Sequence, residues 1–363
     1  MVKLGTGVIA PDGRFDAHRF EALADELAQA ARGRQLTVVS SGAVALGVER
    51  LGFSSRPRDI PGKQACAAVG QSSLMRRYED ALGRRGVVVA QVLLTHSDIA
   101  NRARYLNARH AFAALHAAGA MPIINENDTV SVEELRFGDN DALAGMVVDL
   151  VGAELLILLT DMDGLFTADP RGDASATLIP EVERVTPAVL KLCGNSKSTV
   201  GTGGMRSKLS AAARAADAGA VTVIARGSRD GVLTDILEGK SVGTRIHAGS
   251  AAAGRRKRWI GSDLRARGSL HVDAGARLAI EQGGKSLLPS GVRAVEGTFV
   301  AGDAVEIRDA DGAFARGLSG YSADEVRRIL GKRSSEIEPA LGYKVTDEIV
   351  HRDDLALLTE LRS

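Results

Sequence analysis

Glycine-rich turns beside lysines are the first features of this sequence that could do chemistry. Lys3 ends a short strand and is followed at once by Gly5 and Gly7. Backbone N–H groups in such a turn can bind a phosphate while the ammonium group adds positive charge, although a tight turn without a ligand is the alternative. Gly5, Gly7 and Ala10 also match the spacing of a dinucleotide fingerprint, but the turn-forming residues 11–13 follow where that fingerprint requires a helix.

A second glycine-rich segment, GTGGMRSK at residues 201–208, leads into a helical pattern. Glycine N–H groups at a helix N-terminus, with Lys208 one turn further on, are typical of a phosphate site. A hinge is the alternative explanation of the glycines. The segment is not a P-loop, because the sequence contains no G-x-x-x-x-G-K-[ST].

Polar residues also follow the predicted strands, where open α/β sheets bind their ligands. The SSG sequence at 40–42 ends one strand, and a plain helix N-cap is the alternative there. Residues 125–128 (NEND) follow another strand, and residues 137–141 (FGDND) precede a helical run. Their carboxylates and amides can hold an amino group, orient lysines or help to place Mg²⁺, although Asp139 could equally be a helix N-cap. Beyond a further strand, residues 160–171 form a loop that could wrap a nucleotide base or ribose.

The elements that must position these residues alternate short β-branched runs with longer helical patterns up to about residue 250. This alternation predicts an α/β fold with a parallel sheet that helices cover on both faces. A helix is expected from Asp16, the N-cap, to Arg32, with Gly33 at its C-terminus. The predicted strands are residues 36–41, 87–94, 121–125, 155–160 and 221–225.

The pattern changes at residues 250–258, which are small and then basic, and short strand candidates follow from Gly268 onward. We therefore expect a first domain at 1–252 and a small β-rich domain at 262–354. The basic run at 255–258 is interpreted as a solvated junction, with a nucleic-acid patch as the alternative.

Composition excludes several classes of protein. The chain has 363 residues with 45% apolar and 25% charged residues, and its net charge of +1 supplies no general attraction for nucleic acid or a membrane surface. No signal peptide or membrane span is evident, so a soluble cytoplasmic protein is expected. Cys66 and Cys193 are too few for a disulfide framework and lack metal-ligand spacing, so no metal ligands are assigned.

With these segments in this order, the chain resembles the amino acid kinase family, and most closely the branch that phosphorylates glutamate and ends in a PUA domain. The resemblance implies a three-layer sandwich of helices around a largely parallel sheet, followed by a small β-rich PUA domain. The matching stretches are VVSSGAVALG, KQACAAVGQ, INENDTV, FGDNDALA, LLTDMDGLFTADPR, GTGGMRSK, SLLPSGV, GTFVAGD and VHRDD.

The resemblance implies roles for individual residues. Lys3 and Lys208 are expected to flank the transferred phosphoryl group, with Asp141 organising them. The residues implied to bind glutamate are Ser41, Asp128 and Asn140. The residues implied to bind ATP are Lys3, Thr160, Asp161, Thr202, Gly203, Gly204, Met205, Arg206, Ser207 and Lys208.

The implied reaction transfers phosphoryl from Mg·ATP to the side-chain carboxylate of L-glutamate, as the first step of proline biosynthesis. No general base is required, because a carboxylate with a pKa near 4.3 is already ionised at neutral pH. The resemblance also implies homo-oligomers, feedback inhibition by proline, and glutamyl phosphate reductase as a partner that consumes the product.

The sequence departs from the family pattern at its start. Only Met1 and Val2 precede Lys3, which predicts an unusually short first strand, and Gly7 stands where the family commonly has a small hydroxyl residue. Two other functions stay open. Aspartate or acetylglutamate could be the acceptor, or the PUA domain could make this an RNA-binding protein; near-neutral charge and the lack of a basic stripe with stacking aromatics disfavour RNA.

Overall fold

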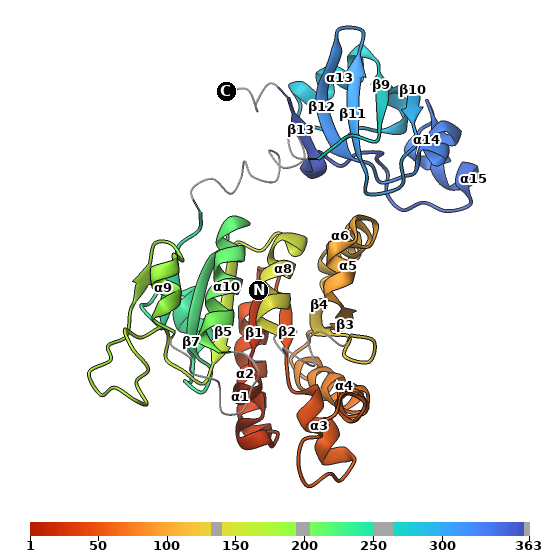
Figure 1. The fold of residues 1–363 in the computed structure, drawn as a ribbon. Coiled ribbons are helices and arrows are strands. Elements are labelled where there is room, and N and C mark those ends of the chain that lie inside the picture. Colours follow the sequence, from red (N-terminus) through yellow and green to blue (C-terminus); the bar gives the residue numbers. More distant parts are fainter. Residues whose placement is uncertain (132–139, 194–203, 250–263, 359–363) are drawn as a thin grey trace. The chain divides into compact units, whose positions relative to one another are not determined.

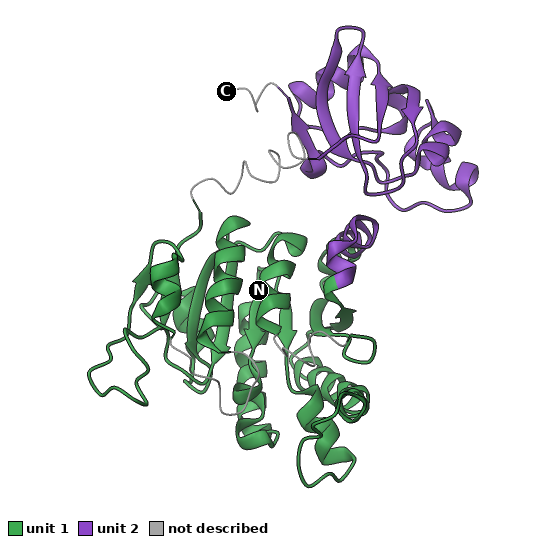
Figure 2. Ribbon diagram, in the orientation of Figure 1, with its two compact units in different colours: residues 1–96, 111–250 green, residues 97–110, 251–363 purple. Residues whose placement is uncertain are grey.

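The computed structural model describes residues 1–131, 140–193, 204–249 and 264–358 (Figure 1). The chain divides into two compact units (Figure 2). The first comprises residues 1–96 and 111–250, and the second comprises residues 97–110 and 251–363. Residues 97–110 therefore group with the second unit, although the sequence pattern assigns them to the first domain.

A largely parallel sheet forms the centre of the first unit, as the sequence predicts. The strand order is β3-β4-β2-β1-β5-β7-β8-β6, and neighbouring strands pair in parallel except β7 with β8. Strands β6 and β8 were not predicted, because two or three residues are too few to show a pattern. The strands are β1 (Val2–Leu4), β2 (Val38–Ser40), β3 (Val89–Leu94), β4 (Met121–Glu126), β5 (Leu155–Thr160), β6 (Glu181–Val182), β7 (Val221–Arg226) and β8 (Thr244–Ile246).

Strand β1 is short, as predicted, yet it lies in the middle of the sheet. Lys3 is in register with Val39 of β2 and Leu158 of β5. The Met1 amino group donates a hydrogen bond to the Leu155 carbonyl oxygen at 2.8 Å. Three residues suffice here because both neighbouring strands bond to β1 and its side chains are buried.

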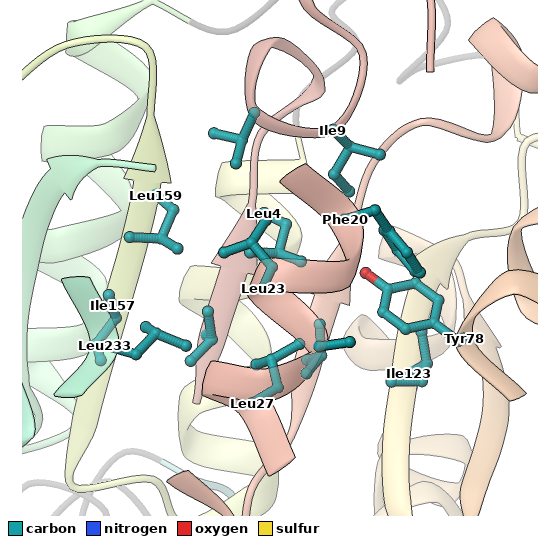
Figure 3. Close-up of a cluster of buried hydrophobic side chains, with 14 of the residues drawn as sticks. Leu4, Ile9, Phe20, Leu23, Leu27, Tyr78, Ile123, Ile157, Leu159 and Leu233 are labelled. Atoms are coloured by element: carbon teal, nitrogen blue, oxygen red, sulfur yellow. The ribbon is translucent and has the colours of Figure 1, made fainter. Parts of the chain in front are cut away.

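Two sets of helices cover the two faces of the sheet. Helices α2, α4 and α11 pack on one face, where Leu4, Phe20, Tyr78 and Leu233 share a core (Figure 3). Helix α8 packs on β1, β2, β4 and β5, and α10 packs on β5 and β7. The helices that lie wholly in the first unit are α1 (Thr6–Ile9), α2 (Ala17–Ala30), α3 (Ala43–Arg50), α4 (Ile60–Gly83), α8 (Asn140–Val151), α9 (Pro187–Lys191), α10 (Met205–Asp217) and α11 (Val232–Leu237). Helix α5 (His96–Ala100) belongs to the second unit from its second residue on, and α6 (Arg102–Ala117) is divided between the two units after residue 110.

Helix α2 shows how local sequence sets an element. The Asp16 side chain accepts a hydrogen bond from the Arg19 N–H at 2.9 Å and so caps the helix N-terminus, as predicted. Phe20, Leu23 and Leu27 recur at helical spacing and are all buried in the core (Figure 3). Capping and periodicity together predict this helix from the sequence, although it ends at Ala30, two residues before the predicted end.

The second unit contains a five-stranded sheet in the order β10-β9-β11-β12-β13. Its core includes Leu270, Ile307, Phe314 and Val326. The β-rich character predicted for this part of the chain is confirmed. Its elements after residue 264 are β9 (Gly268–Val272), α13 (Ala274–Glu281), β10 (Val292–Gly297), β11 (Ala304–Asp309), β12 (Gly312–Leu318), α14 (Ala323–Ile329), α15 (Ile337–Leu341) and β13 (Leu355–Leu357).

Two predictions from composition can be compared with the structure. Among the described residues, none of the helices combines the length and apolar character needed to cross a bilayer. Cys66 and Cys193 are both buried and free, as expected of cysteines outside a disulfide framework.

Candidate active site

Two lysines and one aspartate form a buried charge cluster at the centre of the first unit. Lys3 Nζ lies 2.5 Å from Asp141 Oδ1, and Lys208 Nζ lies 2.9 Å from Asp141 Oδ2. The Asp141 side chain is fully buried, and both lysine side chains are less than 10% exposed. Residues far apart in the sequence thus meet, with two ammonium groups facing one carboxylate.

The side-chain alternation of β1 explains why Lys3 reaches this cluster. Val2 and Leu4 point into the core beneath α2, α4 and α11. Because successive side chains of a strand point to opposite faces, Lys3 points to the face that α8 and α10 cover. Asp141 lies in the first turn of α8, where a carboxylate also suits the helix dipole.

Close packing of α8 and α10 brings Asp141 and Lys208 together. A Cβ atom added at Gly145, one turn after Asp141, would lie 2.9 Å from the Ala211 Cα atom. Glycine is therefore required for this spacing of the two helices. Ser207 adds to the cluster, because its Oγ lies 3.0 Å from Asp141 Oδ2 and 2.8 Å from the Gly204 carbonyl oxygen.

A cavity beside the cluster contains several of the residues implied to bind a nucleotide. Thr160 and Asp161 line it from the end of β5, and Gly204, Met205 and Lys208 line it from the start of α10. The Thr160 hydroxyl donates to Asp161 Oδ1 at 2.9 Å. Arg206 is exposed and does not line the cavity. Thr202 and Gly203 lie outside the described residues.

The wall of this cavity extends beyond the residues named from the sequence. Leu165 and Phe166, from the loop after β5, provide apolar surface. Leu192 and Cys193, from the segment that follows α9, also line the cavity. Burial raises the pKa of the Cys193 thiol. Leu192 and Cys193 carried no motif, so only the tertiary structure could reveal their position.

A neutral hydrogen-bond network surrounds two of the residues implied to bind the acceptor. Asn140 Nδ2 lies within hydrogen-bonding distance of the Ser40 carbonyl oxygen at 3.1 Å, of Ser41 Oγ at 3.0 Å and of Asn125 Oδ1 at 3.0 Å. Asn125 Nδ2 in turn donates to Gln71 Oε1 at 2.8 Å. Ser41 and Asn140 are therefore brought together, from the end of β2 and the start of α8.

Gln71 and Asn125 are functional candidates that were not assigned individual roles from the sequence, although Asn125 was part of the polar cluster predicted to hold an amino group, orient lysines or help to place Mg²⁺. Asn125 belongs to the polar cluster after β4, and Gln71 ends the stretch KQACAAVGQ. Both residues carried a signal, since each lies in a distinctive stretch. Their contact could not be predicted, because Gln71 lies on α4 and Asn125 on β4.

Asp128 stands apart from this network in the described structure. It follows β4 by two residues and is partly buried. Burial raises its pKa to about 6, and the nearby positive charge of Arg56 acts in the opposite direction. No contact among the described residues joins Asp128 to Ser41 or Asn140. Residues 137–139 of the FGDND segment, including Asp139, lie outside the described residues.

The fold and site together define an α/β phosphotransferase. The charge cluster, the nucleotide-type cavity and the amide network all lie near the carboxyl edge of β1, β2, β4 and β5, where parallel sheets bind their ligands. Residues 1–226 match the model of the amino acid kinase family, and residues 268–341 match that of the PUA domain.

Curated relatives match over almost the full chain. The Glutamate 5-kinase of Myxococcus xanthus is 57% identical over 360 residues, covering 99% of this chain and 96% of that protein. The Glutamate 5-kinase of Anaeromyxobacter dehalogenans is 50% identical over 363 residues, with coverage of 99% and 96%. The chain therefore belongs to the amino acid kinase family and carries a PUA domain in its second unit.

Proposed function

We propose that the protein has glutamate 5-kinase activity, transferring the γ-phosphoryl group of ATP to the side-chain carboxylate of L-glutamate in the first step of proline biosynthesis. The buried cluster of Lys3, Asp141 and Lys208 is the observation that carries this proposal. Two ammonium groups against one carboxylate leave a positive charge in a buried position, which favours a bound anion. The Glutamate 5-kinase relatives support glutamate as the acceptor.

In this proposal Lys3 and Lys208 neutralise the charge that develops on the transferred phosphoryl group. Asp141 holds the two ammonium groups at a fixed separation through its two oxygens. Such fixed charges lower the barrier because they need no rearrangement during the reaction. The carboxylate acceptor attacks without a general base, so catalysis depends on alignment and charge neutralisation.

The nucleotide is proposed to occupy the cavity at the end of β5. The N-terminus of α10 directs backbone N–H groups and the positive end of the helix dipole toward it, which suits phosphates. Five of the ten proposed nucleotide residues line this cavity: Thr160, Asp161, Gly204, Met205 and Lys208. The proposed set is Lys3, Thr160, Asp161, Thr202, Gly203, Gly204, Met205, Arg206, Ser207 and Lys208.

The acceptor is proposed to bind beside the amide network. Ser41 and Asn140 offer a hydroxyl and an amide to the substrate carboxylates, and Asp128 offers a carboxylate to the substrate ammonium group. The ammonium group would favour the ionised form of Asp128, whose pKa is raised to about 6 by burial. Substrate binding and ionisation of Asp128 are therefore expected to be coupled.

Magnesium is proposed to enter with the nucleotide as Mg·ATP. Asp141 does not fit as a ligand, because both of its oxygens contact lysine ammonium groups. Mg²⁺ is commonly bound through substrate phosphates and retained waters rather than a full set of protein ligands. We therefore assign no protein residue to the metal.

The remaining proposals concern domains and partners. We propose a kinase domain at residues 1–252 and a PUA domain at 262–354 that acts in oligomerisation or regulation, within a cytoplasmic homo-oligomer. We also propose proline as a feedback inhibitor and glutamyl phosphate reductase as the enzyme that consumes the product. Removing residues from 262 onward should leave some kinase activity, whereas complete loss in a folded fragment would contradict this role of the PUA domain.

The test of the activity measures ADP release from Mg·ATP with glutamate, aspartate or acetylglutamate as acceptor. Hydroxylamine is added to trap an acyl phosphate as a hydroxamate. Hydroxamate formed with glutamate alone is the expected result. Hydroxamate formed with another acceptor would reassign the substrate, and ADP release without hydroxamate would contradict acyl phosphate formation.

A further inference from the structure

Three oxygen atoms form a directed hydrogen-bond chain beneath the proposed acceptor site. The Tyr78 hydroxyl lies 2.8 Å from Ser40 Oγ, and Ser40 Oγ lies 3.0 Å from the Ser41 carbonyl oxygen. A carbonyl oxygen can only accept, so Ser40 must donate to it and must therefore accept from Tyr78. The direction of the chain is thus fixed without knowledge of hydrogen positions.

Tyr78, the donor at the start of this hydrogen-bond chain, is held in a fixed position by its surroundings. Its side chain is fully buried in α4, and its ring meets Phe20 edge-on with centroids 4.8 Å apart. Burial raises the pKa of the Tyr78 hydroxyl, so the group remains a neutral donor. Helix α4 is itself held close to α3, because a Cβ atom at Gly70 would collide with the Ala43 carbonyl oxygen.

The far end of the chain reaches residues proposed to hold the acceptor. Ser40 also accepts a hydrogen bond from Asn140 through its carbonyl oxygen, and Asn140 contacts Ser41 Oγ. Gly42, the next residue, adopts φ +107°, a conformation that permits the sharp change of direction into α3. Ser40 is therefore fixed on both its side chain and its carbonyl group.

We propose that Tyr78 is a positioning residue for the acceptor site, acting through Ser40 on Ser41 and Asn140; this rests on the proposed function. Without the hydroxyl, Ser40 Oγ loses its donor, and the orientation of the 40–42 turn is less well determined. The acceptor should then bind more weakly. The nucleotide cavity is lined from the end of β5, the loop after it, the segment after α9 and the start of α10, and neither Tyr78 nor Ser40 lines it. Nucleotide binding should therefore be unaffected.

The test is Tyr78→Phe in the full-length protein, which removes only the hydroxyl. The KM for glutamate should rise about 3–10-fold, the range expected for loss of one buried hydrogen bond, while the KM for Mg·ATP and kcat stay within about twofold. Tyr321→Phe is the matched control, because Tyr321 is also buried and its hydroxyl donates to the Thr346 carbonyl oxygen in the second unit. It should lower thermal stability without changing either KM.

Ser40→Ala separates action through Ser40 from a general loss of packing. If Tyr78 acts through Ser40, Tyr78→Phe combined with Ser40→Ala should have the same glutamate KM as Ser40→Ala alone. Additive effects, an unchanged glutamate KM in Tyr78→Phe, or equal increases in both KM values would overturn the inference. If the unaltered protein phosphorylates another acceptor, the proposed function fails, and the same KM comparison with that acceptor still decides the role of Tyr78.

Discussion

The charge cluster and the acceptor network lie near the same edge of one sheet but consist of different chemistry. Lys3, Asp141 and Lys208 are ionised groups in direct contact. Around Asn140, by contrast, amides, hydroxyls and backbone carbonyls form the contacts. Charges act over several ångströms and suit a phosphoryl group in transfer, whereas neutral hydrogen bonds depend steeply on geometry and suit recognition of one acceptor.

The two regions also differ in how they are held. The charge cluster depends on the close approach of α8 and α10 at Gly145. The acceptor network depends on α4, which supplies Gln71 and Tyr78 to the ends of β4 and β2. Changes in the first region should therefore affect kcat, and changes in the second should affect the KM for the acceptor.

Lys208→Ala should give the largest effect. It removes one of two preorganised cations at the developing charge, so kcat should fall about 10²–10³-fold. Steady-state kinetics with saturating Mg·ATP and glutamate provide the measurement. Lys240→Ala, which removes a lysine whose side chain is 57% exposed, is the control and should leave kcat unchanged. A near-normal kcat for Lys208→Ala would refute the role of the cluster.

Asn140→Ala should give the next largest effect, on the KM for glutamate. Loss of the amide removes its contacts with Ser40, Ser41 and Asn125. The KM for glutamate should therefore rise about 10–100-fold, which is the range expected when one to two buried hydrogen bonds and a substrate contact are lost. Initial rates over a range of glutamate concentrations measure this. Asn107→Ala, at an exposed position of α6, serves as control. A fall in kcat at unchanged KM would place Asn140 with the charge cluster instead.

The raised pKa of Asp128 predicts that kcat/KM for glutamate depends on pH. With a pKa of about 6, its carboxylate becomes protonated as the pH falls below that value and then loses its attraction for the substrate ammonium group. The ratio kcat/KM for glutamate should therefore fall about tenfold per pH unit below pH 6. In Asp128→Asn this slope should be absent. A slope of the same size in both proteins would assign the titration to another group.

Ser207→Ala should give the smallest effect. The variant removes a hydroxyl 3.0 Å from Asp141 Oδ2 but keeps both lysines, so kcat should fall about 2–5-fold, as for one hydrogen bond. Ser210→Ala is a close match, because its hydroxyl also contacts a backbone carbonyl of α10 but is exposed. Equal kinetics for the two variants would show that Ser207 does not support Asp141.

Much of the first unit could be predicted from local sequence. The runs of β-branched and leucine residues marked β2, β3, β4, β5 and β7, since each is long enough to show its pattern. Asp16 and the spacing of Phe20, Leu23 and Leu27 marked α2. Strands β6 and β8 could not be predicted, because two or three residues are too few to show the alternation of a strand.

The residue types at the ends of the strands, and hence the class of chemistry, could be predicted from the amino-acid sequence. That Lys3 and Lys208 meet around the Asp141 carboxylate became clear only from the folded chain. The same is true of Gln71 and Tyr78, which reach the acceptor network from α4. The physical reason is that these contacts join residues up to 138 positions apart, as in the pair of Lys3 and Asp141, through strand alternation and helix packing. Local sequence patterns do not encode which distant groups come into contact.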